Sequence, residues 1–102
     1  MNIEALQKML EQGQDNLLLR FGLGQALLKD GQTTEAITHL EKALEFDAAH
    51  SASLKLLGKA YTAAGDSNRA IEVYNNGIEQ AEQKGDIQAA KEMKVFLNRL
   101  LK

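Results

Sequence analysis

A period of 34 residues runs through this chain and constrains its fold more than any other feature. When residues 17–50 are aligned with residues 51–84 without a gap, seven positions are identical. The identical pairs are Leu23/Leu57, Gly24/Gly58, Ala26/Ala60, Gly31/Gly65, Ala36/Ala70, Ile37/Ile71 and Glu45/Glu79. A fixed period of this length is typical of a solenoid, because each repeat is one supersecondary unit that cannot bury its apolar face alone. Such stacks usually expose an extended concave surface that binds other chains.

The apolar residues recur at helical spacing, and no segment alternates with period two, so the sequence predicts an all-α fold. We expect six helices joined by short loops, at about 2–12, 17–29, 34–46, 51–63, 67–83 and 87–101. Gly31 and Gly65 stand where the chain must reverse, because glycine readily adopts positive φ. The expected N-caps are Asp15 or Asn16, Thr33 or Thr34, His50 or Ser51, and Asp66 or Ser67.

The two full units resemble the tetratricopeptide repeat (TPR), a helix–turn–helix of 34 residues with small or apolar residues at set places. The residues that carry the resemblance are Leu23-Gly24, Leu27, Gly31, Ala36, Leu40 and Ala43 in the first unit, and Leu54, Leu57-Gly58, Tyr61, Gly65, Ala70, Tyr74 and Gly77 in the second. Arg20 departs from the pattern, since a large apolar residue is expected there. The family's closing proline is also missing, and Ala48 and Glu82 replace it.

The resemblance implies a TPR-like helical solenoid of six antiparallel helices in a single domain, residues 1–102. Residues 1–14 would be the second helix of a truncated repeat, residues 17–50 repeat one, and residues 51–84 repeat two. Residues 86–102 would form a C-terminal capping helix. This last helix resembles the leading helix of a third repeat if two residues are inserted near Lys84–Asp86.

Composition narrows the classes of function. The absence of cysteine excludes disulfides, thiolate metal sites and a cysteine nucleophile, and it fits a reducing compartment. The apolar runs are too short to span a bilayer, and residues 1–13 lack the basic start and apolar stretch of a signal peptide. The net charge of −2 is too small to indicate a nucleic-acid partner. We therefore expect a cytoplasmic protein with neither a membrane nor a nucleic-acid partner.

No constellation in the sequence indicates catalysis or a cofactor. Gly22-Leu23-Gly24 superficially matches a phosphate-binding glycine motif, but it lies inside a helical pattern and follows no strand. His39 and His50 lack a carboxylate cluster at ligand spacing, so we interpret them as solvated histidines on the surface of helices. The serines lack a motif that would mark a nucleophile. The expectation is a protein that is not an enzyme and that carries no cofactor and no metal.

The resemblance also implies where a ligand would bind, because the leading helix of each TPR pair lines the concave groove. The residues that map to this groove are Leu18, Phe21, Gln25, Leu28, Lys29, Lys55, Lys59, Thr62, Lys91 and Arg99. We expect the groove to hold another protein or peptide, anchored near Phe21 and Leu28. Lys55 and Lys59 lie four residues apart on one helix face. They would select an acidic partner, although the alternative that both lysines are simply solvated stays open.

Some TPR proteins clamp a terminal carboxylate with Lys and Asn residues at fixed sites. Phe21, Gln25 and Leu56 stand at three of those sites here, so this particular clamp is absent.

Self-association is the alternative function. Residues 1–83 carry 7 basic and 12 acidic side chains, whereas residues 84–102 carry 5 basic and 2 acidic ones. In the resemblance, an apolar stripe on this basic helix, with Ala90 among its members, faces the place of a missing trailing helix. The candidate interface of a symmetric homodimer is Met93, Leu97 and Leu101. In the opposing interpretation the last helix tilts, buries both faces and leaves a monomer.

Overall fold

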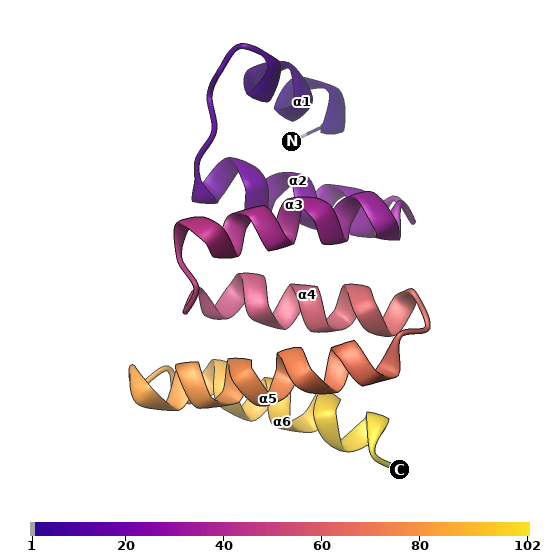
Figure 1. The fold of residues 1–102 in the computed structure, drawn as a ribbon, viewed down its shortest axis with the longest axis vertical. Helices are drawn as coiled ribbons and strands as arrows, with labels where there is room; N and C mark the ends of the chain where they lie inside the picture. The colour runs from indigo at the N-terminus through magenta and orange to yellow at the C-terminus, as the bar shows by residue number, and fades with distance from the viewer. Residues whose placement is uncertain (1) are drawn as a thin grey trace.

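A computed structural model describes residues 2–102, which form six α-helices and no strand. The helices are α1 (Ile3–Glu11), α2 (Leu17–Lys29), α3 (Thr33–Phe46), α4 (Ser51–Ala63), α5 (Ser67–Gln83) and α6 (Ile87–Leu100). They stack along the longest axis, with the two ends of the chain at opposite ends of the stack (Figure 1). The expected all-α solenoid is confirmed, and every expected helix bound lies within one residue of the observed one.

Side chains at the helix starts explain most of these bounds. Asn16 accepts a hydrogen bond from the Leu19 amide at 2.9 Å, and Asp66 accepts one from the Arg69 amide at 3.1 Å. The imidazole of His50 caps α4 by accepting from the Ser53 amide. The expected threonine cap of α3 is wrong, because Gln32 precedes this helix and makes no capping bond with its side chain.

Glycine ends the helices where the chain reverses. Gly31 and Gly65 have φ values of +82° and +80°, a conformation that only glycine adopts without strain. Both expected reversals are therefore confirmed.

Small residues bring the two helices of each repeat close together. Ala36 and Ala70 are completely buried, as expected. Gly24 lies beneath Leu40, and Gly58 lies beneath the ring of Tyr74, so close that a Cβ atom would overlap either partner. Tyr74 is only 1% exposed and belongs to a core cluster that extends from α3 to α6.

The orientation of α6 differs from the expectation. Met93 is completely buried, and it lies over Gly77 of α5 so that a Cβ atom there would be 2.5 Å from its sulfur. Ala90 is also buried, and Leu97 is half-buried against the same core. The expected uncovered stripe is therefore wrong for these residues, because α6 turns them toward α5. Of the candidate dimer residues, only Leu101 is well exposed, at 61%.

The helices divide into two faces. We call α2, α4 and α6 the leading face, and α1, α3 and α5 the trailing face. Within the leading face α2 contacts α4 and α4 contacts α6, whereas α3 and α5 do not contact each other. The leading helices carry seven basic and one acidic side chain, and the trailing helices carry eight acidic and three basic ones. The two sets of helices therefore have net charges of opposite sign.

Candidate functional site

A cleft between α4 and α6 gathers basic and aromatic side chains on the leading face. It has a volume of about 370 Å³, and its lining is Lys59, Thr62, Tyr74, Phe96, Arg99 and Leu100. The ammonium of Lys59 lies 4.6 Å from the centroid of the Phe96 ring, and the guanidinium of Arg99 lies 5.6 Å from it. The lining contains no acidic residue.

This arrangement fits an anionic group with an apolar neighbour. The face of an aromatic ring attracts cations, so Phe96 holds two positive charges near the cleft. The buried ring of Tyr74 lies 5.9 Å from Phe96, centroid to centroid, and keeps the cleft apolar beneath the charges. A carboxylate at the rim would meet two cations, while an adjacent apolar side chain would contact Phe96 and Leu100.

Lys55 and Lys59 lie four residues apart on α4, but only the charge of Lys55 has an acidic partner. The ammonium of Lys55 lies 3.2 Å from a carboxylate oxygen of Glu92, so this charge is already compensated across α4 and α6. The groove residue expected on α6 is Lys91, but the residues of α6 that contact the two lysines of α4 are Glu92 and Phe96. Lys91 itself is exposed. The sequence holds no signal that separates this pair from Lys91 and Val95, which are also four apart.

The groove residues of α2 lie apart from this cleft. Phe21 is half-buried and contacts the ring of His50 edge-on, with centroids 5.5 Å apart. Leu28 is half-buried against both core clusters, while Leu18 is 75% exposed. Gln25 and Lys29 line a separate hollow of about 430 Å³ between α1 and α2. The structure therefore distributes the expected residues over separate places rather than one site.

Comparison with known proteins identifies the family. The model of the family described as tetratricopeptide repeat matches residues 27–93, which is well over half of the chain. The chain belongs to the tetratricopeptide repeat family. A TPR repeat-containing protein of Pseudomonas aeruginosa is 50% identical over 100 residues, which are 98% of this chain and 95% of the relative.

Solved structures agree with this assignment to the TPR family. The solution structure of a Bordetella parapertussis protein has a TM-score of 0.86 at 42% identity, over 97% of this chain and 86% of that one. A tetratricopeptide repeat domain protein of Salinibacter ruber has a TM-score of 0.77 at 26% identity, over 84% of this chain and 87% of that one. TPR proteins are generally protein-interaction modules and typically non-catalytic scaffolds.

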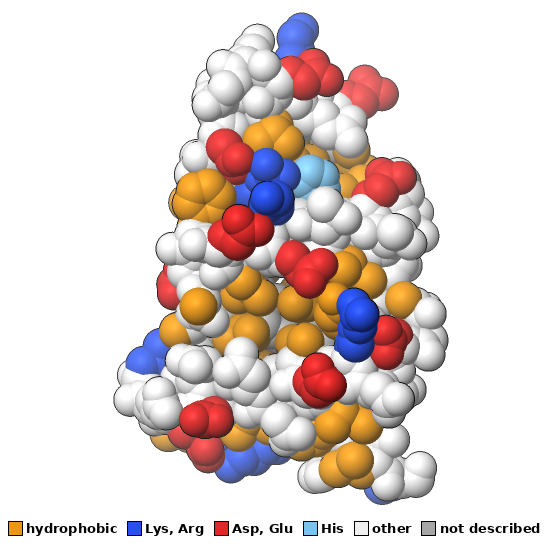
Figure 2. All heavy atoms as spheres, viewed as in Figure 1, with side chains coloured by type: hydrophobic (Ala, Val, Ile, Leu, Met, Phe, Trp, Pro, Cys, Tyr) orange, Lys and Arg blue, Asp and Glu red, His pale blue; other side chains and the backbone are white. Residues whose placement is uncertain are grey.

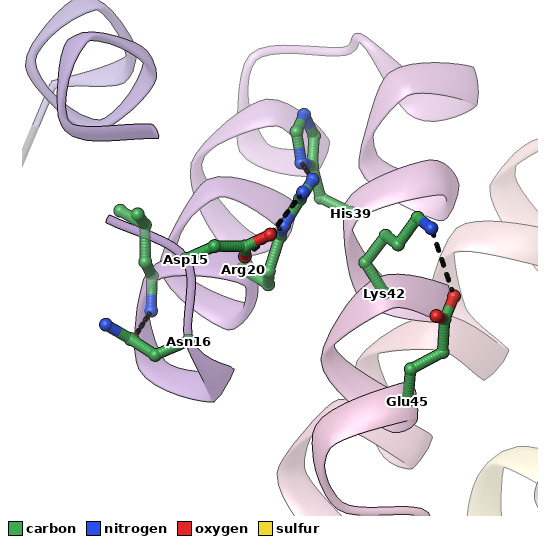
Figure 3. Close-up of polar contacts among 7 residues, drawn as sticks. Asp15, Asn16, Arg20, His39, Lys42 and Glu45 are labelled. Carbon is green, nitrogen blue, oxygen red and sulfur yellow. Dashed lines mark hydrogen bonds and ion pairs between the residues drawn. The ribbon is translucent and has the colours of Figure 1, made fainter. Parts of the chain in front are cut away.

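Arg20, the departure from the TPR pattern, is part of a polar network (Figure 3). Its guanidinium donates to both carboxylate oxygens of Asp15 at 2.7 and 2.9 Å, and it contacts Nδ1 of His39 at 3.0 Å. The expectation that His39 and His50 are simply solvated is wrong. Both are half-buried: His39 meets Arg20, and His50 caps α4.

The network sets the protonation of its members. The hydrogen bond from Arg20 lowers the pKa of Asp15 below its ordinary value. Burial, together with the nearby charge of Arg20, lowers the pKa of His39 below 6.5. Neutral His39 can accept the hydrogen bond of Arg20 at Nδ1, whereas protonated His39 cannot.

Among residues 2–102, no three histidine, aspartate or glutamate side chains come together in a way that could hold a metal ion. Over the same range, none of the helices has the length and apolar character needed to cross a membrane.

Proposed function

We propose that this TPR chain is a non-catalytic interaction module whose leading face binds an acidic segment of another protein. One observation carries the proposal: Lys59 and Arg99 flank Phe96 in a cleft without acidic lining. The excess of basic side chains on the leading helices supports it, because a field of one sign steers oppositely charged partners toward the surface.

Charge and apolar contact have separate roles in the proposed binding. Lys59 and Arg99 would receive a carboxylate, whereas the Thr62 hydroxyl already donates to the carbonyl of Gly58 at 2.8 Å and would only border the ligand. An apolar residue next to the acidic one would lie against Phe96 and Leu100, where burial contributes roughly 25 cal/mol per Å² of apolar surface. Lys55 would contribute less than Lys59, because Glu92 compensates its charge.

A peptide titration tests this function. The probes are short fluorescein-labelled peptides that alternate Glu and Leu, with matched peptides in which Gln or Lys replaces Glu. Fluorescence anisotropy should show binding of the Glu peptide, weaker binding of the Gln peptide, and loss of affinity at high salt, since exposed charges are screened over about 8–10 Å. Lys59→Glu with Arg99→Glu should weaken binding of the Glu peptide about tenfold, because two attractive contacts become repulsive.

The matched control reverses two charges elsewhere. Lys42→Glu with Arg69→Glu changes the net charge equally, but both residues lie on the trailing face. This variant should keep nearly all of the affinity that the cleft provides. Equal loss in both double variants would show that only net charge matters and would contradict the cleft.

Self-association through α6 is the less supported alternative. Met93 is buried and Leu97 half-buried, so the expected interface retains Leu101 as its one well-exposed member. Val95 is 49% exposed, yet it lies half a turn away from Met93. Analytical ultracentrifugation over a range of concentrations distinguishes the two functions, since groove binding predicts a monomer without ligand.

A further inference from the structure

The trailing face has a hollow of its own. It has a volume of about 450 Å³, and its lining is Glu41, Leu57, Tyr61, Arg69, Glu72 and Val73. Because α3 and α5 do not contact each other, α4 forms the floor between them. Figure 2 shows this face, with a recessed apolar band between α3 and α5 and acidic side chains beside it.

The floor and the rim of the hollow differ in chemistry. Leu57 and Tyr61 are almost completely buried and Val73 is half-buried, so they leave an apolar floor. Glu41 and Glu72 provide carboxylates at the rim and are both exposed. The hydroxyl of Tyr61 donates to Glu41 at 3.2 Å.

The charges at the rim are only partly compensated. Arg69 lies 3.5 Å from Asp66, and its guanidinium is 5.9 Å from the centroid of the Tyr61 ring. Glu72 has no ion-pair or hydrogen-bond partner among the described residues, and Glu41 has only the neutral hydroxyl of Tyr61. The rim therefore keeps a negative potential that the acidic excess of the trailing helices reinforces.

We propose that this hollow binds a lysine or arginine side chain of a partner protein, flanked by apolar residues. Long basic side chains bury their aliphatic stems on apolar surface and keep the charged head at the edge. The stem would lie on Leu57 and Val73, and the head would reach Glu41 and Glu72. The guanidinium of Arg69 already lies over the ring of Tyr61, so this ring adds apolar floor for the stem while the two carboxylates receive the head.

Charge complementarity decides between occupants. An acidic segment would meet two carboxylates and one cation, Arg69, whose charge Asp66 already compensates at 3.5 Å. A purely apolar segment would leave the carboxylates without a counter-charge while reducing their hydration. A basic segment satisfies the rim and covers the floor. The site is separate from the cleft on the leading face and prefers the opposite charge, so one domain could bridge an acidic and a basic partner.

The test uses short labelled peptides that alternate Lys or Arg with Leu, titrated against the full chain. Fluorescence anisotropy should show salt-sensitive binding, and Glu41→Gln with Glu72→Gln should weaken it about fivefold through the loss of two exposed ion pairs. The matched control is Glu35→Gln with Glu79→Gln, which removes the same charges from the exposed surfaces of α3 and α5, away from the lining. This control should change the affinity little.

Chemical-shift mapping completes the test. Titration of the basic peptide into ¹⁵N-labelled protein should shift the amide signals of Leu57, Tyr61 and Val73. Equal affinity of the two double variants, or shifts confined to other residues, would overturn the proposal. Self-association of the chain that is abolished by Glu41→Gln with Glu72→Gln would also overturn it, because a second copy would then be the occupant. If the basic peptide does not bind, the proposed binding of an acidic segment still stands, because the acidic-peptide titration tests the cleft on the leading face.

Discussion

Gly58 of α4 lies directly beneath the ring of Tyr74 of α5, where a Cβ atom would overlap the ring carbons. The same contact occurs 34 residues earlier, where a Cβ on Gly24 would lie 2.5 Å from Cγ of Leu40. This glycine contact is one physical basis of the repeat period. With the two-residue insertion, the corresponding residue of α6 is Lys94, which instead forms an ion pair with Glu82 at 2.8 Å. A helix could not approach Lys94 as closely as α5 approaches Gly58.

The first prediction compares two glycine substitutions within helices. Gly58→Ala should destabilise the protein by about 1–3 kcal/mol, because the added methyl group displaces Tyr74 from the core. Gly22→Ala should stabilise it by about 0.5–1 kcal/mol through helix propensity, because a Cβ there meets only Leu6 at 3.9 Å. Urea unfolding followed by circular dichroism measures both, and the same sign for the two variants would contradict the packing described.

The second prediction concerns the alanines that separate paired helices. Ala70→Leu should cost about 1–3 kcal/mol, because Ala70 is completely buried and the added carbons find no space. Ala63→Leu, at an exposed position in α4, should change the free energy of unfolding by less than about 0.5 kcal/mol. Thermal denaturation gives the comparison, and indistinguishable melting temperatures would argue against the repeat alignment.

The third prediction is a pH dependence at His39. Its folded-state pKa lies below 6.5, so the unfolded chain binds more protons once the pH falls below that value. Stability should be complete above 6.5 and should decrease as the pH falls toward the folded pKa. His39→Gln, which keeps a hydrogen-bond acceptor for Arg20 but cannot titrate, should remove this part of the dependence.

Asp15 adds a second pH dependence of the folding stability, at lower pH than His39. Its pKa is lowered by Arg20, so its contribution is present above its ordinary value of 3.8 and is lost as the pH falls through the folded pKa. Urea unfolding of wild type, His39→Gln and Asp15→Asn over a range of pH separates the two effects. An unchanged slope in His39→Gln just below 6.5 would show that burial and Arg20 do not lower the pKa of His39 in solution.

The fourth prediction uses the orientation of α6. Met93→Glu should destabilise the monomer by at least about 3 kcal/mol, because it places a charge in a completely buried position. Leu101→Glu should change stability by less than about 0.5 kcal/mol, since Leu101 is 61% exposed. Sedimentation and urea unfolding measure both. A stable Met93→Glu protein that differs from wild type only in oligomeric state would restore the dimer interface.

The sequence predicts most of the fold because local signals agree with the repeat. The glycines at Gly31 and Gly65 end helices, Asn16 and Asp66 begin them, and the 34-residue period pairs the helices. The cap of α3 escapes prediction because Thr33 lies inside the helix rather than before it.

The candidate site is less predictable, because it depends on which residues of α6 face α4. The period breaks at the insertion before α6, and neighbouring residues of a helix point about 100° apart, so a register that differs by one residue exchanges Lys91 for Glu92 beside Lys55. Likewise, the sequence shows Arg20 only as a departure from the TPR pattern. Its partner Asp15 lies five residues earlier, just before α2, whereas His39 lies nineteen residues away and reaches Arg20 only through the packing of α3 on α2.

The most direct test of the central claim is chemical-shift mapping of an acidic peptide on ¹⁵N-labelled protein. The Glu–Leu peptide should shift the amide signals of Lys59, Thr62, Phe96 and Arg99. With Lys59→Glu and Arg99→Glu, about tenfold more peptide should be needed to shift Thr62 and Phe96, while the protein stays folded. Shifts that spare these four residues, or that persist unchanged in the double variant, would contradict an acidic-segment site on the leading face.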